Sequence, residues 1–179
     1  KNKKIFNIVG GCVATFASEK VLSYEVTNSV CIGEGEKTIV ELARSLVNGD
    51  SLDNIPNFAY KKGKNKIHRS TNNFLIPTKN FDIPKFHLFQ KERIWRPMDG
   101  KFYRMIPIEF SRGCPYKCTY CSAPSYNDKF ADIGRWLRHK TMNQIMTEIE
   151  YNIERLDVEY FYFISETFLA IPKKMRKEF

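Results

Sequence analysis

Apolar runs that end in glycine alternate with an amphipathic stretch over the first fifty residues. The runs IFNIVGG at 5–11 and SVCIGEG at 29–35 each predict a buried strand followed by a turn. From Glu36 onward, apolar residues recur at the spacing of one helical face, and Gly49 supplies a stop. The residues of this face are Ile39, Leu42, Ala43 and Leu46. The order strand, short helix, strand, helix predicts parallel α/β structure, with a glycine turn at the carboxyl end of each strand.

The middle of the chain combines a hairpin pattern with a stretch rich in proline and aromatic residues. Residues 55–69 predict a small hairpin that turns through Lys62, Gly63 and Lys64. Residues 70–104 contain Pro77, Pro84 and Pro97 among many aromatic side chains. This composition predicts an extended linker that packs against its neighbours, because it is too aromatic for a disordered segment.

A second α/β unit is predicted from residue 103. The run YRMIPIEF at 103–110 predicts a strand, and VEYFYFIS at 158–165 predicts another. Between them, Thr141 and Gln144 form a capping box that opens a helix with apolar positions at regular spacing. These positions are Ile145, Ile149, Ile153 and Leu156. Strand, helix and strand make a βαβ unit, so we divide the chain into 1–54, 55–102 and 103–179.

Charge and composition narrow the classes of function and location. The net charge is +9, from 29 basic and 20 acidic residues, with one dense basic run at 61–69. A solvated hairpin tip accounts for this run, so we do not expect a nucleic-acid partner. No apolar run approaches the ~18 residues of a membrane span, so we expect no membrane partner. The five cysteines favour free thiols in a reducing cytoplasm. The sequence begins without Met and stops in a helical pattern, so we expect a piece of a longer polypeptide.

Three of the five cysteines, Cys114, Cys118 and Cys121, lie within eight positions in the segment SRGCPYKCTYCSAPS. A structural zinc site or a ferredoxin-type cluster would use a fourth protein ligand. Three thiolates can instead hold three irons of a cubane cluster and leave the fourth iron open to a non-protein ligand. The alternatives are a zinc site completed by His139 and three unconnected buried thiols.

The spacing Cys114-x3-Cys118-x2-Cys121, with Tyr120 before the last cysteine, resembles the signature of radical S-adenosylmethionine (SAM) enzymes. The resemblance implies a 4Fe–4S cluster on these thiolates, with SAM chelating the open iron. It also implies one-electron cleavage of SAM to methionine and a 5′-deoxyadenosyl radical, which takes hydrogen from a substrate. An external electron donor such as flavodoxin or ferredoxin would supply the electron.

Two further residues have roles implied by this resemblance. Tyr120 would lie against the adenine of SAM, the alternative being an aromatic residue of the core. Glu166, at the end of the second strand, would face the SAM ribose or ammonium; the alternative is an acid that favours a helix N-terminus. Ser165 stands where members of the family commonly carry aspartate.

The two glycine turns resemble the second half of the cobalamin-binding domain that precedes many radical SAM barrels. The matching residues are Gly10, Gly11 and Thr15 in the first turn and Gly33, Glu34, Gly35 and Glu36 in the second. Glycines there would let the backbone approach a bulky cofactor. The implied fold is the C-terminal part of a Rossmann-like cobalamin-binding domain, followed by the first βαβ unit of a radical SAM partial TIM-type barrel. A similar scaffold without a cofactor is the alternative.

The leading hypothesis is therefore a cobalamin-dependent radical SAM methyltransferase acting at an unreactive carbon of a small molecule. A radical SAM methylthiotransferase acting on tRNA or protein is the first alternative, but it needs a second cluster, for which only Cys12 and Cys31 remain. We expect both of these thiols to be buried and inert. The second alternative is a non-catalytic iron–sulfur electron-transfer module, which would close all four iron sites with protein ligands.

Overall fold

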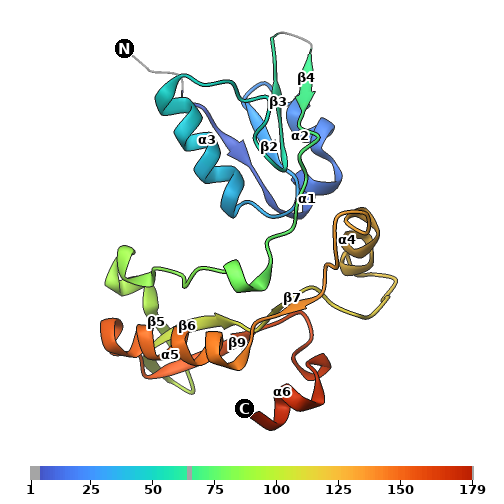
Figure 1. The fold of residues 1–179 in the computed structure, drawn as a ribbon. Helices are drawn as coiled ribbons and strands as arrows, with labels where there is room; N and C mark the ends of the chain where they lie inside the picture. The colour runs from blue at the N-terminus through green and yellow to red at the C-terminus, as the bar shows by residue number, and fades with distance from the viewer. Residues whose placement is uncertain (1–4, 64–65, 179) are drawn as a thin grey trace. The chain divides into compact units, whose positions relative to one another are not determined.

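A computed structural model describes residues 5–63 and 66–178 of the chain (Figure 1). Lys64, part of the predicted hairpin turn, lies outside the described residues. The chain forms two compact units, which divide between Leu75 and Ile76. Both units combine helices with β-sheet, so the predicted α/β class is confirmed at this level.

The first unit begins with the predicted alternation of strands and helices. Its elements are β1 (Ile8–Val9), α1 (Gly11–Phe16), α2 (Ser18–Ser23), β2 (Ser29–Cys31), α3 (Glu36–Asn48), β3 (Phe58–Lys61) and β4 (Ile67–Arg69). The pair β1 and β2 is parallel, with Ile8 opposite Ser29, as predicted. The predicted hairpin β3–β4 forms, and β3 pairs antiparallel with β2. The sheet order β1-β2-β3-β4 is therefore mixed, because the hairpin extends the sheet that the parallel strands begin.

Helix α3 matches its predicted ends but buries a narrower face than its periodicity indicates. It ends at Asn48, and Gly49 takes the left-handed conformation with φ 75°. Leu42 is 3% exposed and packs with Ile55 and Phe58. Ile39 and Leu46 are 49% and 46% exposed. The strands β1, β2 and β3 are only two to four residues long, so the sheet has a small face for α3 to pack on. The residues of α3 that are buried are Thr38 and Leu42.

The dense basic run belongs to the hairpin, and its Lys62 side chain forms an ion pair with a nearby residue of the same unit. Lys62 Nζ lies 2.7 Å from Asp53 Oδ2, and the Tyr60 hydroxyl donates to Asp53 Oδ1 at 2.7 Å. The hydrogen bonds from Lys62 and Tyr60 lower the pKa of Asp53 to about 2. These contacts agree with a structural role for the run.

The second unit contains the predicted βαβ arrangement. Its strands are β5 (Trp95–Met98), β6 (Lys101–Glu109), β7 (Ser111–Arg112), β8 (Arg138–His139) and β9 (Tyr160–Ile164). Its helices are η1 (Thr78–Asn80), η2 (Phe86–Leu88), η3 (Lys91–Ile94), α4 (Ala123–Lys129), α5 (Met142–Leu156), η4 (Phe168–Ala170) and α6 (Lys173–Glu178). Strands β6 and β9 are parallel, with Ile108 opposite Phe163, and α5 connects them along the chain. The capping box of Thr141 and Gln144 at the start of α5 is confirmed.

The elements of this unit that were not predicted include β5 and α4. Residues 95–98, within the stretch interpreted as linker, form β5 and pair antiparallel with β6. Asp99 and Gly100 make the turn with φ 48° and 71°, and an Asp-Gly pair with positive φ at both positions is a strong hairpin signal. Helix α4 follows the cysteine segment, where the sequence indicated only a polar stretch.

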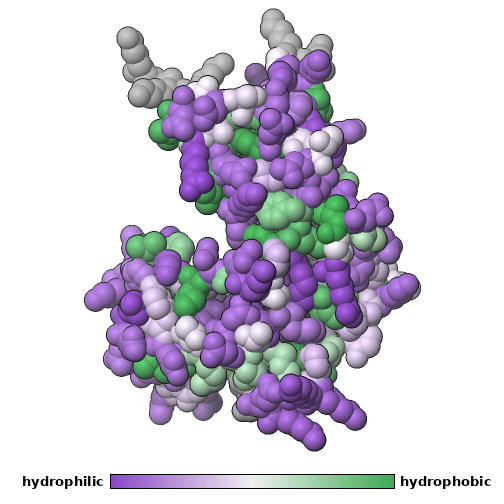
Figure 2. Space-filling view, viewed as in Figure 1, coloured by the Kyte–Doolittle hydropathy of each residue, from purple (hydrophilic) through white to green (hydrophobic). Residues whose placement is uncertain are grey.

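The core of the second unit lies between α5 and the strands β6 and β9. Ile108, Phe110 and Ile145 are fully buried there, and Ile171 and Met175 close its edge. Apolar side chains also remain on the surface, and Figure 2 shows some as green patches on the visible face. No helix among residues 5–63 and 66–178 is long and apolar enough to cross a membrane.

Candidate functional site

The cysteine segment starts where the two parallel strands of the βαβ unit end. The Phe110 N–H donates to the Ile164 carbonyl at 3.0 Å, and the Lys140 N–H donates to the Phe110 carbonyl at 3.1 Å. The hydroxyls of Ser111 and Ser165 lie 2.7 Å apart. These contacts fix the carboxyl edge of β6 and β9, which is the functional edge of parallel α/β sheets.

Gly113 holds the segment tightly against the chain that leads into β8. Its φ is +94°, which favours glycine. A Cβ at this position would lie 2.7 Å from Trp136 Cδ1 and 2.8 Å from Leu137 Cα. The backbone before Cys114 therefore packs at a distance that only glycine permits.

The three cysteines lie in different environments. Cys114 is 8% exposed, whereas Cys118 and Cys121 are exposed. The Cys121 N–H donates to the Cys118 carbonyl at 3.1 Å, which makes a turn between them. Among the described residues, no three His, Cys, Asp or Glu side chains are gathered closely enough to hold a metal ion. The implied cluster requires the three sulfurs to converge, and the structure does not show this convergence.

The residue proposed to complete a zinc site is part of a strand. His139 belongs to β8 and pairs with Ser111. Its Nδ1 is buried without a hydrogen-bond partner among the described residues, and burial lowers the pKa of His139. It does not join the cysteines in a metal-sized group.

Tyr120 projects from the cysteine segment into solvent, with 91% of its surface exposed. The negative charge of Cys118 and a hydrogen bond to Cys118 raise the pKa of Tyr120. The alternative of a core aromatic residue is therefore wrong for this structure. An exposed ring beside two cysteines can contact a planar ligand.

The turn after β9 approaches the first cysteine. The Cys114 sulfur lies 3.1 Å from Thr167 Oγ1. The Thr167 N–H donates to Ser165 Oγ at 3.3 Å, so the serine in place of an aspartate has a structural contact. Sequence reasoning missed Thr167, which lies 53 positions from Cys114 and belongs to no recognised motif.

Glu166 lies in the same turn among charged residues that sequence reasoning also missed. Partial burial raises the pKa of Glu166, while a hydrogen bond from the Gly113 backbone lowers it. Glu109, Arg112 and Arg138 also act on this carboxyl through their charges. Arg112 donates to both oxygens of Glu109, at 3.0 Å each. The carboxyl edge thus carries two acids and two guanidinium groups, a set that can bind a zwitterionic ligand.

In the first unit, the side chain of Thr15 joins the two glycine turns. Thr15 Oγ1 accepts from the Gly33 N–H at 3.0 Å and donates to the Gly11 carbonyl at 2.9 Å. Thr15 is 1% exposed, so its hydroxyl joins the two turns inside the protein. Gly10 and Gly11 are exposed and leave backbone accessible at the first turn.

Side-chain hydrogen bonds fix the backbone of the second glycine turn. The Glu34 carbonyl accepts from Asn57 Nδ2 at 2.9 Å and from Thr38 Oγ1 at 3.4 Å. Glu34 is buried, whereas Glu36 is exposed at the start of α3. These two hydrogen bonds therefore fix the backbone of the turn that follows the carboxyl end of β2.

The two remaining thiols differ from each other. Cys31 is buried as expected, and burial raises its pKa. Cys12 is exposed, so the expectation of a buried thiol is wrong there. The strand β1 ends at Val9, and Cys12 lies in the first turn of α1 beyond the sheet.

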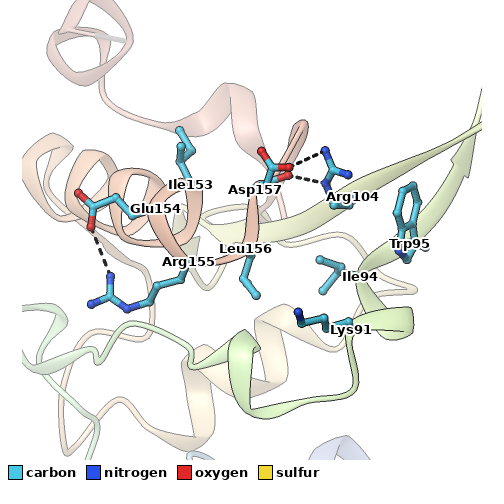
Figure 3. Close-up of a pocket in the computed structure, with 9 residues that line it drawn as sticks. All are labelled: Lys91, Ile94, Trp95, Arg104, Ile153, Glu154, Arg155, Leu156 and Asp157. Carbon is cyan, nitrogen blue, oxygen red and sulfur yellow. Dashed lines mark hydrogen bonds and ion pairs between the residues drawn. The ribbon is translucent and has the colours of Figure 1, made fainter.

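A pocket of about 500 Å³ lies toward the amino end of β6 (Figure 3). Arg104 in its wall lies 3.0 Å from Asp157 Oδ2 and packs over Trp95 at 5.4 Å. The cysteine segment follows the other end of β6, at Glu109. The pocket is therefore separate from the candidate site, and the Arg104 contacts connect the end of α5 to the strand.

Comparison with known proteins agrees with this arrangement. Residues 108–179 match the model of the radical SAM superfamily. The chain is 26% identical over 179 residues to an uncharacterized methyltransferase of Pyrococcus horikoshii, with 97% of the chain and 36% of the relative covered. It is 27% identical over 146 residues to the hopanoid C-3 methylase of Methylococcus capsulatus, with 80% of the chain and 26% of the relative covered. The chain thus spans about a third or less of these relatives.

A solved structure has a similar fold. The cobalamin-dependent SAM radical enzyme OxsB, with aqua-cobalamin and SAM bound, superposes with a TM-score of 0.64. The sequence identity is 19%, and the match covers 95% of this chain and 22% of OxsB. The family resemblance drawn from the cysteine spacing is confirmed by the superfamily match. Residues 108–179, with Cys114, Cys118 and Cys121 near their start, therefore belong to the radical SAM superfamily.

Proposed function

We propose that the full-length protein is a radical SAM enzyme that transfers a methyl group to an unreactive carbon of a small molecule with the help of cobalamin. One observation carries the proposal: a three-cysteine segment follows the first strand of a βαβ unit, within the residues that match the superfamily. The methyltransferase and methylase relatives support methyl transfer as the reaction.

The donor chemistry of the cysteine segment fits a 4Fe–4S cluster. Cys114, Cys118 and Cys121 would hold three irons as thiolates and leave the fourth for SAM. A cluster held by these three cysteines would supply the electron for the cleavage of SAM into methionine and a 5′-deoxyadenosyl radical. An external one-electron donor, such as flavodoxin or ferredoxin, is required because each cleavage consumes an electron.

The surrounding residues are suited to hold SAM in place. Tyr120 is exposed beside Cys118, where its ring can lie against adenine. Glu166 lies at the carboxyl edge, where a carboxylate can accept from the ribose or ammonium groups. Arg112 and Arg138 near it offer positive charge to the SAM carboxylate.

Cobalamin is the second cofactor that we propose. The joined glycine turns at 10–15 and 33–36 support it, since Gly10, Gly11 and the backbone at Gly33 and Gly35 leave room for a nucleotide tail. The fold similarity to a cobalamin-bound enzyme is consistent with this assignment. In this proposal Thr15 acts by holding the two turns together. Glu34 and Glu36 would contribute through the backbone at the start of α3.

The test is iron content together with SAM cleavage in the anaerobically reconstituted full-length protein. We expect about four irons per chain, as one cubane cluster requires. Cys114→Ala, Cys118→Ala and Cys121→Ala should each abolish the cluster and the cleavage of SAM. Cys12→Ala and Cys31→Ala serve as matched controls and should retain both.

Two outcomes would replace the proposal with an alternative. Iron sufficient for two clusters, lost in part when Cys12 or Cys31 is changed, would indicate a methylthiotransferase. A cluster that forms but never cleaves SAM would indicate an electron-transfer module. No iron in the wild-type protein would contradict both the proposal and these alternatives.

A further inference from the structure

The pocket of Figure 3 lies apart from the cysteine segment and has a volume typical of small-molecule sites. The volume is about 500 Å³, within the range of about 300–1,000 Å³ that ligand sites occupy. One wall comes from η3 and the start of β5, which supply Lys91, Ile94 and Trp95. The other wall comes from the last turn of α5 and includes Leu156. All of the lining residues belong to the second unit, so the pocket is formed within one compact part of the chain.

Three apolar side chains give the pocket a surface for a flat ligand. Ile94 is 7% exposed, and Leu156 is half-buried. Trp95 is 42% exposed, and the Arg104 guanidinium packs over its ring at 5.4 Å. A tryptophan ring that is exposed in a pocket can stack on a planar ligand. The lining therefore favours a ligand with a flat, apolar body.

The charged side chains of the pocket favour an anionic group on that ligand. Three cations and two acids line the pocket, and each acid is paired with an arginine. In both pairs the acid is the more exposed side chain, at 89% against 28% for Asp157 and Arg104, and 73% against 44% for Glu154 and Arg155. Among the residues that the structure describes, the Lys91 ammonium has no ion-pair partner. Lys91 is therefore the cation of the lining that a ligand can neutralise.

The C-terminal end of α5, which also borders the pocket, is neutralised by Arg104. A helix has a partial negative charge at its C-terminus. Arg104 Nε donates to the Asp157 carbonyl at 2.6 Å, and the Asp157 N–H donates to the Ile153 carbonyl at 3.2 Å. The Arg104 guanidinium also lies 3.0 Å from the Asp157 carboxylate and 3.5 Å from that of Glu159. Since Arg104 is engaged with the helix end and these acids, the attraction for an anion comes from Lys91.

We propose that this pocket binds a small amphipathic organic anion, a molecule with a flat apolar body and one carboxylate, sulfonate or phosphate group. The body lies against Trp95, Ile94 and Leu156, and the anionic group pairs with Lys91. The site is independent of the proposed iron–sulfur chemistry, because it uses no residue of the cysteine segment and lies toward the other end of β6.

The experiment titrates the full-length protein with two fluorescent dyes that share an apolar body and differ in charge. Anilinonaphthalene sulfonate is an amphipathic anion, and phenylnaphthylamine is the same body without the sulfonate. The proteins are wild type, Lys91→Gln, Trp95→Ala and Lys101→Gln. Lys101 is exposed at the start of β6 and does not line the pocket, so Lys101→Gln is the matched control for the loss of one positive charge.

We expect Lys91→Gln to weaken the binding of the sulfonate dye about fivefold, the size of one exposed charge contact. The same variant should bind the neutral dye as wild type does, because it removes no apolar contact surface. Trp95→Ala should weaken the binding of both dyes about tenfold, since both lose the ring on which they stack. Lys101→Gln should bind both dyes as wild type does.

Three results would overturn the inference. One is an equal affinity of wild type and Lys91→Gln for the sulfonate dye. Another is a loss in Lys91→Gln that the neutral dye or Lys101→Gln shows as well, which would indicate a general change of charge or fold. The third is that neither dye binds the wild-type protein, which is the result expected if another part of the longer chain fills the pocket. Iron content and SAM cleavage, which test the proposed function, do not enter any of these outcomes.

Discussion

At the scale of single residues, the position of the cysteine segment depends on Gly113. The segment must pass Trp136 and Leu137 at less than the distance that a side chain needs. The residue also has a backbone conformation that side chains disfavour. Gly113 directly precedes Cys114. A shift of the backbone at Gly113 would therefore move Cys114, the first proposed ligand.

We expect Gly113→Ala to destabilise the second unit by about 2–4 kcal/mol, from overpacking and left-handed strain together. The cluster content should fall in the same variant. The control is Gly100→Ala, where φ is +71° and no atom lies within 4 Å of the added Cβ. That change should cost only about 1–2 kcal/mol and leave iron binding intact. The measurements are hydrogen exchange of the β6 amides and iron content. Equal effects of the two substitutions would contradict a packing role for Gly113.

At the scale of secondary-structure elements, a buried ion pair joins α5 to the chain before it. Lys140 Nζ lies 2.7 Å from Glu148 Oε2, and the two side chains are 3% and 2% exposed. Burial raises the pKa of Glu148, against the effect of the hydrogen bond from Lys140. Lys140 also donates its backbone N–H to Phe110. The pair thus connects the helix to the strand end that begins the cysteine segment.

We expect Glu148→Ala to lower the free energy of opening of α5 by about 3–5 kcal/mol, because it leaves the Lys140 charge buried without a partner. The double variant Lys140→Met, Glu148→Leu should recover most of the loss, since it removes both charges and keeps apolar volume. Glu154→Ala is the control on the same helix, because its ion pair with Arg155 is exposed and should matter little. Hydrogen exchange of the α5 amides measures each case. A double variant as unstable as the single one would mean that the charges are not the cause.

At the scale of the whole molecule, the proposed cobalamin site must be tested in the full-length protein, because this chain covers only 36% of the Pyrococcus horikoshii relative. A substitution at Gly10 can test the proposed cobalamin site without disturbing the fold. Gly10 has φ −120° and ψ −170°, which any residue can adopt. A Cβ there would make only an ordinary contact, 3.9 Å from Cys31 Cβ. A side chain at Gly10 would therefore occupy the proposed groove without straining the fold.

We expect Gly10→Leu to weaken the retention of hydroxocobalamin by the full-length protein about tenfold or more, which corresponds to about 1.4 kcal/mol. The visible spectrum of the bound cofactor gives the measurement. Gly49→Asn is the control, because asparagine tolerates the left-handed conformation and α3 separates Gly49 from the second turn by about 20 Å. Retention that is equal in wild type and Gly10→Leu would remove the first turn from the proposed site.

Several features of this protein were determined by the sequence alone, because the signals are local. The capping box of Thr141 and Gln144 places the start of α5 at the predicted residue, and Gly49 ends α3. The cysteine spacing identified the family before any contact was known. The Asp99-Gly100 turn was equally local, and its hairpin signal was present in the sequence although the linker interpretation passed over it.

Other features were decided only by tertiary structure, because they join residues far apart along the chain. The contact of Cys114 with Thr167 spans 53 positions, and that of Thr15 with Gly33 spans 18. The resemblance implied that Thr15 belongs to a cobalamin site, whereas packing places its hydroxyl inside the protein, where it joins the two turns. Lys140 and Glu148 lie only eight positions apart, but the burial of this pair also depends on how the elements around it pack. Periodicity and spacing specify which elements form, whereas the partner of each side chain depends on how those elements pack.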